Sequence, residues 1–238
     1  MRLPRAVTLL AASLTFQTAF AVPTPRDSSS LLYVYDALCG WCYGFSAALE
    51  TFSEAHPELP VRVVSGGMIL GEREGPIGEV AAYIKRAYRD VERATGVAFG
   101  AGFVDGPLER GDMLMSSLPP AALLAWARER APERQREAAK IIQEGIYGLG
   151  YGPTTPALAR HLAAGLGLDG EEAVAALGNP TYRRQAEADF ALAQRLGVRG
   201  FPALFLVDAA GGARLLASGY RTAAQLKSAL AEASAARR

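Results

Sequence analysis

The sequence predicts an α/β fold in which a small sheet is interrupted by a long helical insertion. Short runs rich in β-branched and aromatic residues, at 31–35 and 61–64, are typical of strands. A third run of this kind comes only at 203–207. Before it, apolar residues recur at three- and four-residue spacing, which indicates amphipathic helices at 76–94, 120–130, 133–149, 156–166 and 181–196.

The N-terminal residues have the features of a secretory signal peptide. Arg2 and Arg5 precede an apolar run at 6–16, and Ala19-Phe20-Ala21 supplies the small residues of a cleavage site. The run is short for a membrane span, and no other segment approaches the length of one. We therefore expect residues 1–21 to be removed and the protein to be exported to the periplasm, without stable membrane insertion. The alternative is an uncleaved membrane anchor.

The composition is that of a globular protein with a full core, since 50% of the residues are hydrophobic and 21% are charged. Loss of the signal peptide removes two of the 25 basic residues and leaves 23 against 24 acidic ones, a formal charge of −1. The basic residues form no stripe with interleaved aromatic residues. We expect no nucleic-acid partner.

The strand at 31–35 leads through Asp36 into Cys39-Gly40-Trp41-Cys42, and a helix is predicted at 43–55. Cys39 should therefore lie at a helix N-terminus, where free backbone N–H groups and the helix dipole favour an anion. Cys42 should lie one turn further in, where it is more shielded. This arrangement predicts a redox pair in which the Cys39 thiolate attacks a disulfide and Cys42 resolves the mixed intermediate.

Other roles for the two cysteines are less well supported. A disulfide closing so short a loop adds little stability, and a zinc site needs two more ligands. His56 and His161 are the only histidines, and neither lies in a ligand cluster. An inert pair is the remaining alternative. We expect redox chemistry without a metal or organic cofactor.

After the helical region, Gly200-Phe201-Pro202 precedes the strand at 203–207, a turn at 208–212 leads to a strand at 213–217, and Thr222 can cap a last helix. Proline cannot donate to a sheet ladder, so Pro202 should lie at the first strand position or in a bend. Bends are where cis X-Pro bonds occur, although most X-Pro bonds are trans.

The whole pattern resembles the DsbA family of thioredoxin-fold thiol-disulfide oxidoreductases. The stretch from Asp36 to Phe45 is similar to the D-x-x-C-x-W-C-Y-G-F motif of a branch described as predicted protein-disulfide isomerases, and residues 64–67 and 196–202 also resemble that branch. The resemblance implies a thioredoxin-like fold with the helical insertion between the second strand and the cis-proline strand. It also implies that Cys39 attacks, that Cys42 resolves, that a cis Pro202 packs against the pair, and that Phe201 offers its backbone to a substrate peptide.

On this basis we expect a redox domain formed by 30–68 and 181–235, with an inserted helical domain at 69–180. The expected activity is disulfide exchange with exported cysteine-containing proteins, as an oxidase or an isomerase, with a redox partner that resets the pair. A glutathione-handling oxidoreductase of the same fold is one alternative, because some relatives bind a small thiol near a segment comparable to 113–120. A redox-inactive, client-binding chaperone is the other.

Three further residues have open roles. Asp36 could relay protons to Cys42, or it could cap the next helix or bind loop amides. Trp41 lies between the cysteines at the start of a helix, and we expect it to contact client proteins. Ser117 could cap the helix predicted at 120–130.

Overall fold

The computed structural model describes residues 29–235. The predicted signal peptide, 1–21, lies outside these residues. None of the helices in this part of the chain has the length and apolar character needed to cross a membrane.

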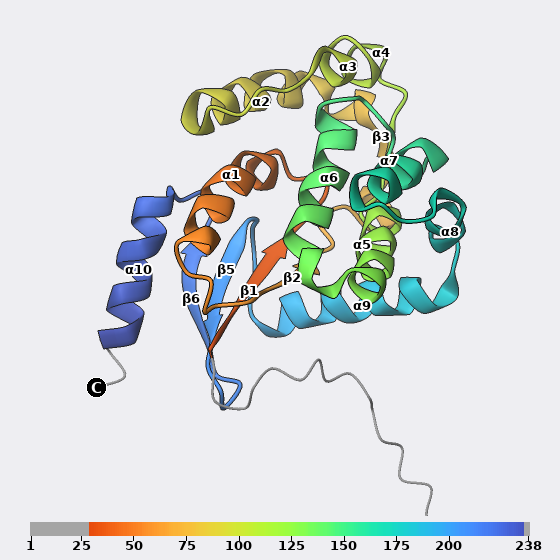
Figure 1. The fold of residues 1–238 in the computed structure, drawn as a ribbon. Coiled ribbons are helices and arrows are strands. Elements are labelled where there is room, and N and C mark those ends of the chain that lie inside the picture. Colours follow the sequence, from red (N-terminus) through yellow and green to blue (C-terminus); the bar gives the residue numbers. More distant parts are fainter. Residues whose placement is uncertain (1–28, 236–238) are drawn as a thin grey trace, which may run out of the picture.

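A four-stranded sheet forms the centre of the molecule, in the order β2-β1-β5-β6 (Figure 1). Strand β1 (Ser30–Tyr35) pairs in parallel with β2 (Val61–Ser65) and antiparallel with β5 (Ala203–Val207). Strand β6 (Ala213–Ser218) completes a hairpin with β5. The predicted α/β fold is confirmed.

Helices cover both faces of the sheet. On β1, Leu31, Tyr33 and Tyr35 belong to the core shared with α1 (Gly40–Glu54) and α10 (Ala223–Ala235). Leu32 and Val34 point to the opposite face, where they pack in a cluster with residues of α9 (Pro180–Arg195). Because β1 is buried on both faces, its sequence is a continuous apolar run rather than an alternating one.

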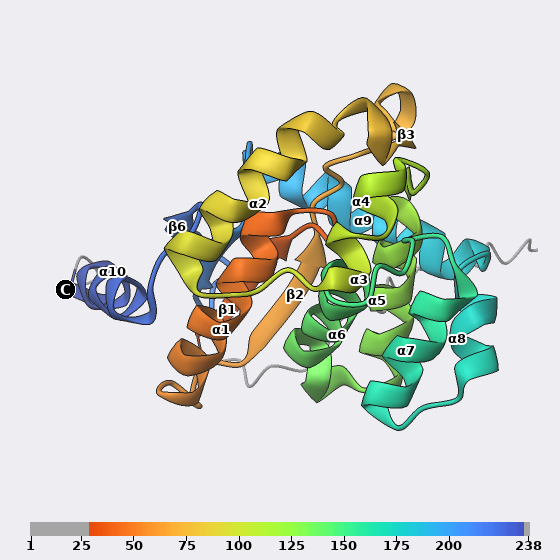
Figure 2. The same ribbon diagram turned by 90° about the horizontal axis from the view of Figure 1, so that it is seen from above.

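The helical insertion lies to one side of the sheet, with α5, α6, α7 and α8 grouped together in both ribbon views (Figures 1 and 2). The elements of this region are η1 (Gly71–Arg73), β3 (Gly75–Pro76), η2 (Ile77–Glu79), α2 (Ala81–Thr95), α3 (Ala101–Val104), α4 (Pro107–Arg110), β4 (Leu114–Met115), α5 (Leu118–Arg130), η3 (Pro132–Arg134), α6 (Gln135–Tyr147), α7 (Pro156–Leu166) and α8 (Gly170–Ala176).

Most of the predicted helices are present, but the one expected from residue 76 begins only at Ala81. The two-residue strand β3 pairs there with β4, and η2 follows it. Strands of this length contain no repeat that a sequence pattern could reveal. The short helices α3, α4 and α8 were also not predicted.

Helix α5 joins the insertion to the sheet. It packs against α6, α8 and α9, and its residues from Pro120 to Ala127 are all buried. A buried ion pair reinforces this contact: Arg128 Nη1 lies 2.7 Å from Asp189 Oδ2 of α9 and also donates to the Val63 carbonyl of β2. The same carboxylate oxygen accepts from the Ser65 N–H. One charge pair therefore connects α5, α9 and β2.

Arg128→Met should destabilise the protein by about 3 kcal/mol, because it leaves the Asp189 carboxylate buried without its cation. Urea unfolding of the reduced protein measures this loss. The control is Arg183→Met, which breaks an exposed pair with Glu187 and should change stability by less than about 0.5 kcal/mol. Equal effects of the two substitutions would show that the buried pair does not hold the insertion to the sheet.

Candidate redox site

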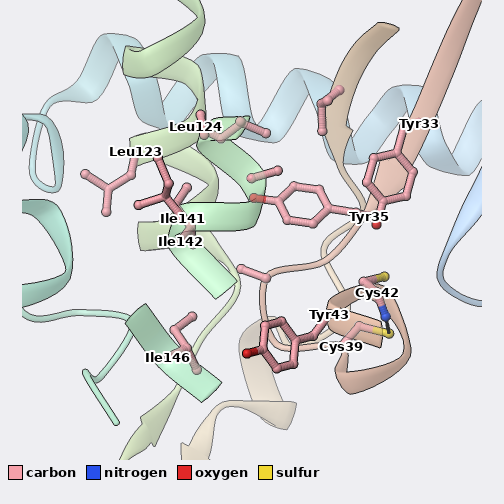
Figure 3. Close-up of a cluster of buried hydrophobic side chains, with 14 of the residues drawn as sticks. Tyr33, Tyr35, Cys39, Cys42, Tyr43, Leu123, Leu124, Ile141, Ile142 and Ile146 are labelled. Carbon is pink, nitrogen blue, oxygen red and sulfur yellow. Dashed lines mark hydrogen bonds between the residues drawn. The ribbon is translucent and has the colours of Figure 1, made fainter. Parts of the chain in front are cut away.

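Cys39 is the N-cap residue of α1, and its sulfur accepts a hydrogen bond from the Cys42 N–H at 3.4 Å (Figure 3). An N-cap side chain usually offers an oxygen to these N–H groups, and the positive end of the helix dipole favours a negative charge there. Both cysteines are free thiols, with Cys39 6% exposed and Cys42 completely buried. Cys39 is therefore the sulfur that a substrate can reach.

Cys42 lies in the first turn of α1, facing the core. Burial raises the pKa of the Cys42 thiol well above its ordinary value, and the neighbouring Cys39 sulfur raises it further. Cys42 consequently stays protonated at neutral pH. Cys42 is thus the less accessible of the two thiols and is held in its protonated form, as a resolving thiol should be.

At the start of α1, Gly40, Trp41 and Gly44 are in close contact with neighbouring parts of the chain. A Cβ on Gly40 would lie 3.3 Å from Cζ of Phe99, and one turn later a Cβ on Gly44 would lie 2.8 Å from a methyl carbon of Val91. Glycine at these positions lets α2 and the segment after it pack closely on α1. Trp41 is half-buried, with its ring centroid 6.3 Å from that of Tyr220. Only part of the indole remains available to a substrate.

The Phe201-Pro202 bond is cis, which confirms the prediction made from the resemblance. The Phe201 carbonyl accepts a hydrogen bond from the Cys39 thiol at 3.5 Å. The Phe201 ring packs so closely on Gly66 that a Cβ there would lie 1.9 Å from a ring carbon. The loop before β5 therefore lies directly beside Cys39, as the predicted peptide-binding role requires.

Asp36 is buried and binds backbone amides. Its Oδ1 accepts from the Leu38 N–H at 3.0 Å, and its Oδ2 accepts from the Met68 N–H at 2.8 Å. Ser117 Oγ donates to Oδ1 at 3.0 Å. Within residues 29–235, no hydrogen bond joins this carboxylate to either cysteine. The contacts fit the binding of loop amides, which is one of the roles that the sequence analysis left open for Asp36.

Ser117 occupies the N-cap position of α5, but its side chain makes no capping bond, so that prediction is wrong. Its oxygen instead accepts from the Ile69 N–H at 2.9 Å while its hydroxyl donates to Asp36. The neighbouring Ser116 donates to Glu74. Because both hydroxyls are occupied by the protein, the segment at 113–120 does not offer them to a ligand.

Gln143 of α6 is a site residue that the sequence analysis missed. Its buried Nε2 lies 3.3 Å from the Asp36 carbonyl and 3.3 Å from the Cys39 carbonyl. On the same helix face, Tyr147 packs against the ring of Tyr43. The helical insertion therefore contacts the cysteine turn directly. The sequence signal that could have identified Gln143 was an amide side chain on the apolar face of a predicted helix.

The two histidines lie among other side chains. His56 is 3.0 Å from Glu58 and packs against the ring of Phe52, whereas His161 packs against Tyr151. No cluster of three or more potential metal ligands occurs in the described part of the chain.

Together, a sheet in the order β2-β1-β5-β6, a cysteine pair at the start of α1 and a cis-proline loop beside it define a thioredoxin-like thiol-disulfide oxidoreductase. The DSBA-like thioredoxin domain family matches residues 31–231, so the chain belongs to that family. The predicted family and enzyme class are confirmed.

Solved structures agree with this assignment. A proposed protein disulfide isomerase from Nitrosomonas europaea has a TM-score of 0.74 at 22% identity, over 87% of this chain and 97% of that one. The cytosolic disulfide reductase DsbM from Pseudomonas aeruginosa has a TM-score of 0.70 at 30% identity, over 87% of this chain and 98% of that one. DsbM with GSH also matches, with a TM-score of 0.70 at 29% identity, over 88% of this chain and 100% of that one. The comparison with curated proteins gave no match.

Asp36 should make stability depend on pH in a defined direction. Burial raises the pKa of this carboxyl above its ordinary value, although the hydrogen bonds from Met68, Leu38 and Ser117 oppose the shift. The native state thus binds the proton more tightly, and the stability this provides is lost as pH rises through the native pKa. Wild type should therefore lose stability relative to Asp36→Asn as the pH is raised from about 4 towards neutral.

Urea unfolding of both proteins across this range measures the difference, in which other titrating groups cancel. Asp112→Asn is a control of opposite sign, because a hydrogen bond from Arg110 lowers the pKa of the exposed Asp112. The stability of wild type relative to Asp112→Asn should therefore increase slightly as pH rises. A wild-type advantage over Asp36→Asn that grew with pH would contradict the assigned environment of Asp36.

Proposed function

We propose that this protein exchanges disulfides with exported cysteine-containing proteins through Cys39 and Cys42, as an oxidase or an isomerase. The observation that carries the proposal is the asymmetry of the pair. The Cys39 sulfur caps α1 beside the Phe201 carbonyl, whereas the Cys42 thiol is sealed in the core with a raised pKa. One sulfur is placed to react with a client and the other to release it.

In the oxidising direction, a client thiolate attacks Cys39 Sγ of the oxidised pair. A bond forms between the two sulfurs, the Cys39–Cys42 bond breaks, and its electron pair goes to Cys42 Sγ. A second client thiolate then attacks the client sulfur of the mixed disulfide and releases the Cys39 thiolate. The client gains a disulfide and the protein keeps two thiols, which a redox partner must oxidise again. For isomerisation, the reduced Cys39 thiolate attacks a client disulfide, and the last exchange regenerates it.

The surface next to Cys39 suits an extended peptide. The Phe201 backbone lies beside the reacting sulfur, and the half-buried Trp41 lies between the two cysteines in the sequence. Backbone groups bind any sequence, whereas an indole adds apolar contact without demanding a particular partner. These contacts favour clients that are not yet folded.

Glutathione is a second candidate reactant, as the small thiol that resets the pair. Its support is the similar DsbM structure that contains GSH. In this chain the hydroxyls of Ser116 and Ser117 are bound within the protein, so we place its contact at Cys39 and not at those side chains.

Cys39→Ala should abolish exchange, whereas Cys42→Ala should accumulate mixed disulfides at Cys39 because nothing resolves them. Acid quenching followed by intact-mass analysis measures this, with a cysteine-containing peptide or oxidised glutathione as substrate. The double variant Cys39→Ala/Cys42→Ala is the control. Exchange that persists in Cys39→Ala would reverse the assigned order, and client binding unchanged in the double variant, with no exchange in wild type, would favour the chaperone alternative.

Export is part of the proposal, supported by the signal-peptide features of residues 1–21. Expression of the full chain in a Gram-negative host should give a periplasmic protein whose intact mass corresponds to a chain beginning at Val22. A cytoplasmic protein of full-length mass would contradict export and would place the exchange reaction in a reducing compartment, as for the cytosolic DsbM.

A further inference from the structure

Two tyrosines of β1 carry buried hydroxyls that are not accounted for by the fold. Tyr33 and Tyr35 lie on the same face of the strand, are 3% and 0% exposed, and their rings are neighbours, with centroids 5.7 Å apart. Within the described range of residues, the Tyr35 hydroxyl has no hydrogen-bond partner, and the Tyr33 hydroxyl has none apart from the Cys42 side chain. A buried polar group without a partner is destabilising, so natural proteins contain few of them.

The two hydroxyls point in different directions (Figure 3). The Tyr35 hydroxyl is directed away from the cysteines, towards the helices that carry Leu124 and Ile141, whereas the Tyr33 hydroxyl is directed towards the Cys42 sulfur. Burial raises the pKa of Tyr33 well above its ordinary value, and the charge of Cys42 raises it further. Tyr33 therefore keeps its proton and remains a hydrogen-bond donor whenever Cys42 is charged.

We propose that the Tyr33 hydroxyl donates a hydrogen bond to the Cys42 sulfur when that sulfur leaves the disulfide as a thiolate. The inference rests on the proposed roles of Cys39 and Cys42.

The need for such a donor follows from the burial of Cys42. When a thiolate attacks Cys39, the Cys39–Cys42 bond breaks and its electron pair stays on Cys42 Sγ. The new anion has no access to solvent, since Cys42 is 0% exposed, and it has not yet gained a proton. A hydrogen bond to a charged group is stronger than one between neutral groups. The donor therefore stabilises the charge as it develops, and the same bond holds the Cys42 thiolate when it attacks Cys39 in the reverse step.

Tyr33→Phe removes only the hydroxyl, and Tyr35→Phe makes the same change in an equally buried neighbour. The oxidised variants are reduced with dithiothreitol at fixed pH, and the loss of the Cys39–Cys42 disulfide is followed by acid quenching and mass analysis. Tyr33→Phe should slow this step about tenfold or more, which is the loss expected for one hydrogen bond to a charged group. Tyr35→Phe should leave the rate within about twofold of wild type, since its hydroxyl does not face Cys42.

A second reaction distinguishes an effect of Tyr33 on the leaving Cys42 sulfur from a general effect of Tyr33 on the site. In Cys42→Ala carrying glutathione on Cys39, reduction by dithiothreitol no longer involves Cys42. Adding Tyr33→Phe to this protein should therefore leave the rate unchanged. A similar slowing here would show that Tyr33 acts on the shape of the site and would overturn the inference.

Equal rates for Tyr33→Phe and Tyr35→Phe would also overturn it, whether both were slow or both normal. Failure of the proposed function has a different signature, because oxidised wild type would then show no attack at Cys39.

If Tyr33→Phe does not fold, fluorotyrosine at position 33 keeps the shape and makes the hydroxyl a stronger donor. Disulfide reduction should then be faster than in wild type, and an unchanged rate would contradict the inference.

Discussion

The buried carboxylate of Asp36 is the interaction on which the site depends. It accepts hydrogen bonds from Leu38 in the cysteine turn, from Met68 in the loop after β2 and from Ser117 at the start of α5. These three segments are distant in sequence, and none could keep a fixed position beside the others without shared contacts. Burial of the carboxyl raises its pKa, which shows that the hydrogen bonds offset only part of the lost hydration. The geometry of the turn is therefore maintained at a cost in stability.

The helical insertion is part of the frame of the redox site. Gln143 of α6 binds the carbonyls of the cysteine turn, and Tyr147 packs against Tyr43 of α1. On the other side, Arg128 of α5 and Asp189 of α9 connect the insertion to β2. Contacts at both ends mean that a shift of α5 or α6 would move the cysteine turn. The insertion can thus influence the reactivity of Cys39 without contributing a reacting atom.

Much of this arrangement could be predicted from local sequence. The strands β1 and β5 are apolar runs because they are buried, and the spacing of Cys39 and Cys42 indicated their chemistry. The cis bond at Pro202 followed from the family resemblance. The true partners of Ser117 and Gln143 could not be predicted, because their bonds to Asp36 span 81 and 107 residues of sequence. Only the folded chain determines which distant donor meets which acceptor.

The close contact between Gly66 and the Phe201 ring has a consequence for the history and redesign of the chain. Since a methyl group on residue 66 would overlap the ring, the two positions cannot be chosen independently. Side chains at 66 and 201 should therefore covary among homologues, with alanine at 66 tolerated only beside a smaller residue at 201. A library that varies the peptide-binding loop one residue at a time would miss these combinations, whereas paired codons at the two positions would sample them.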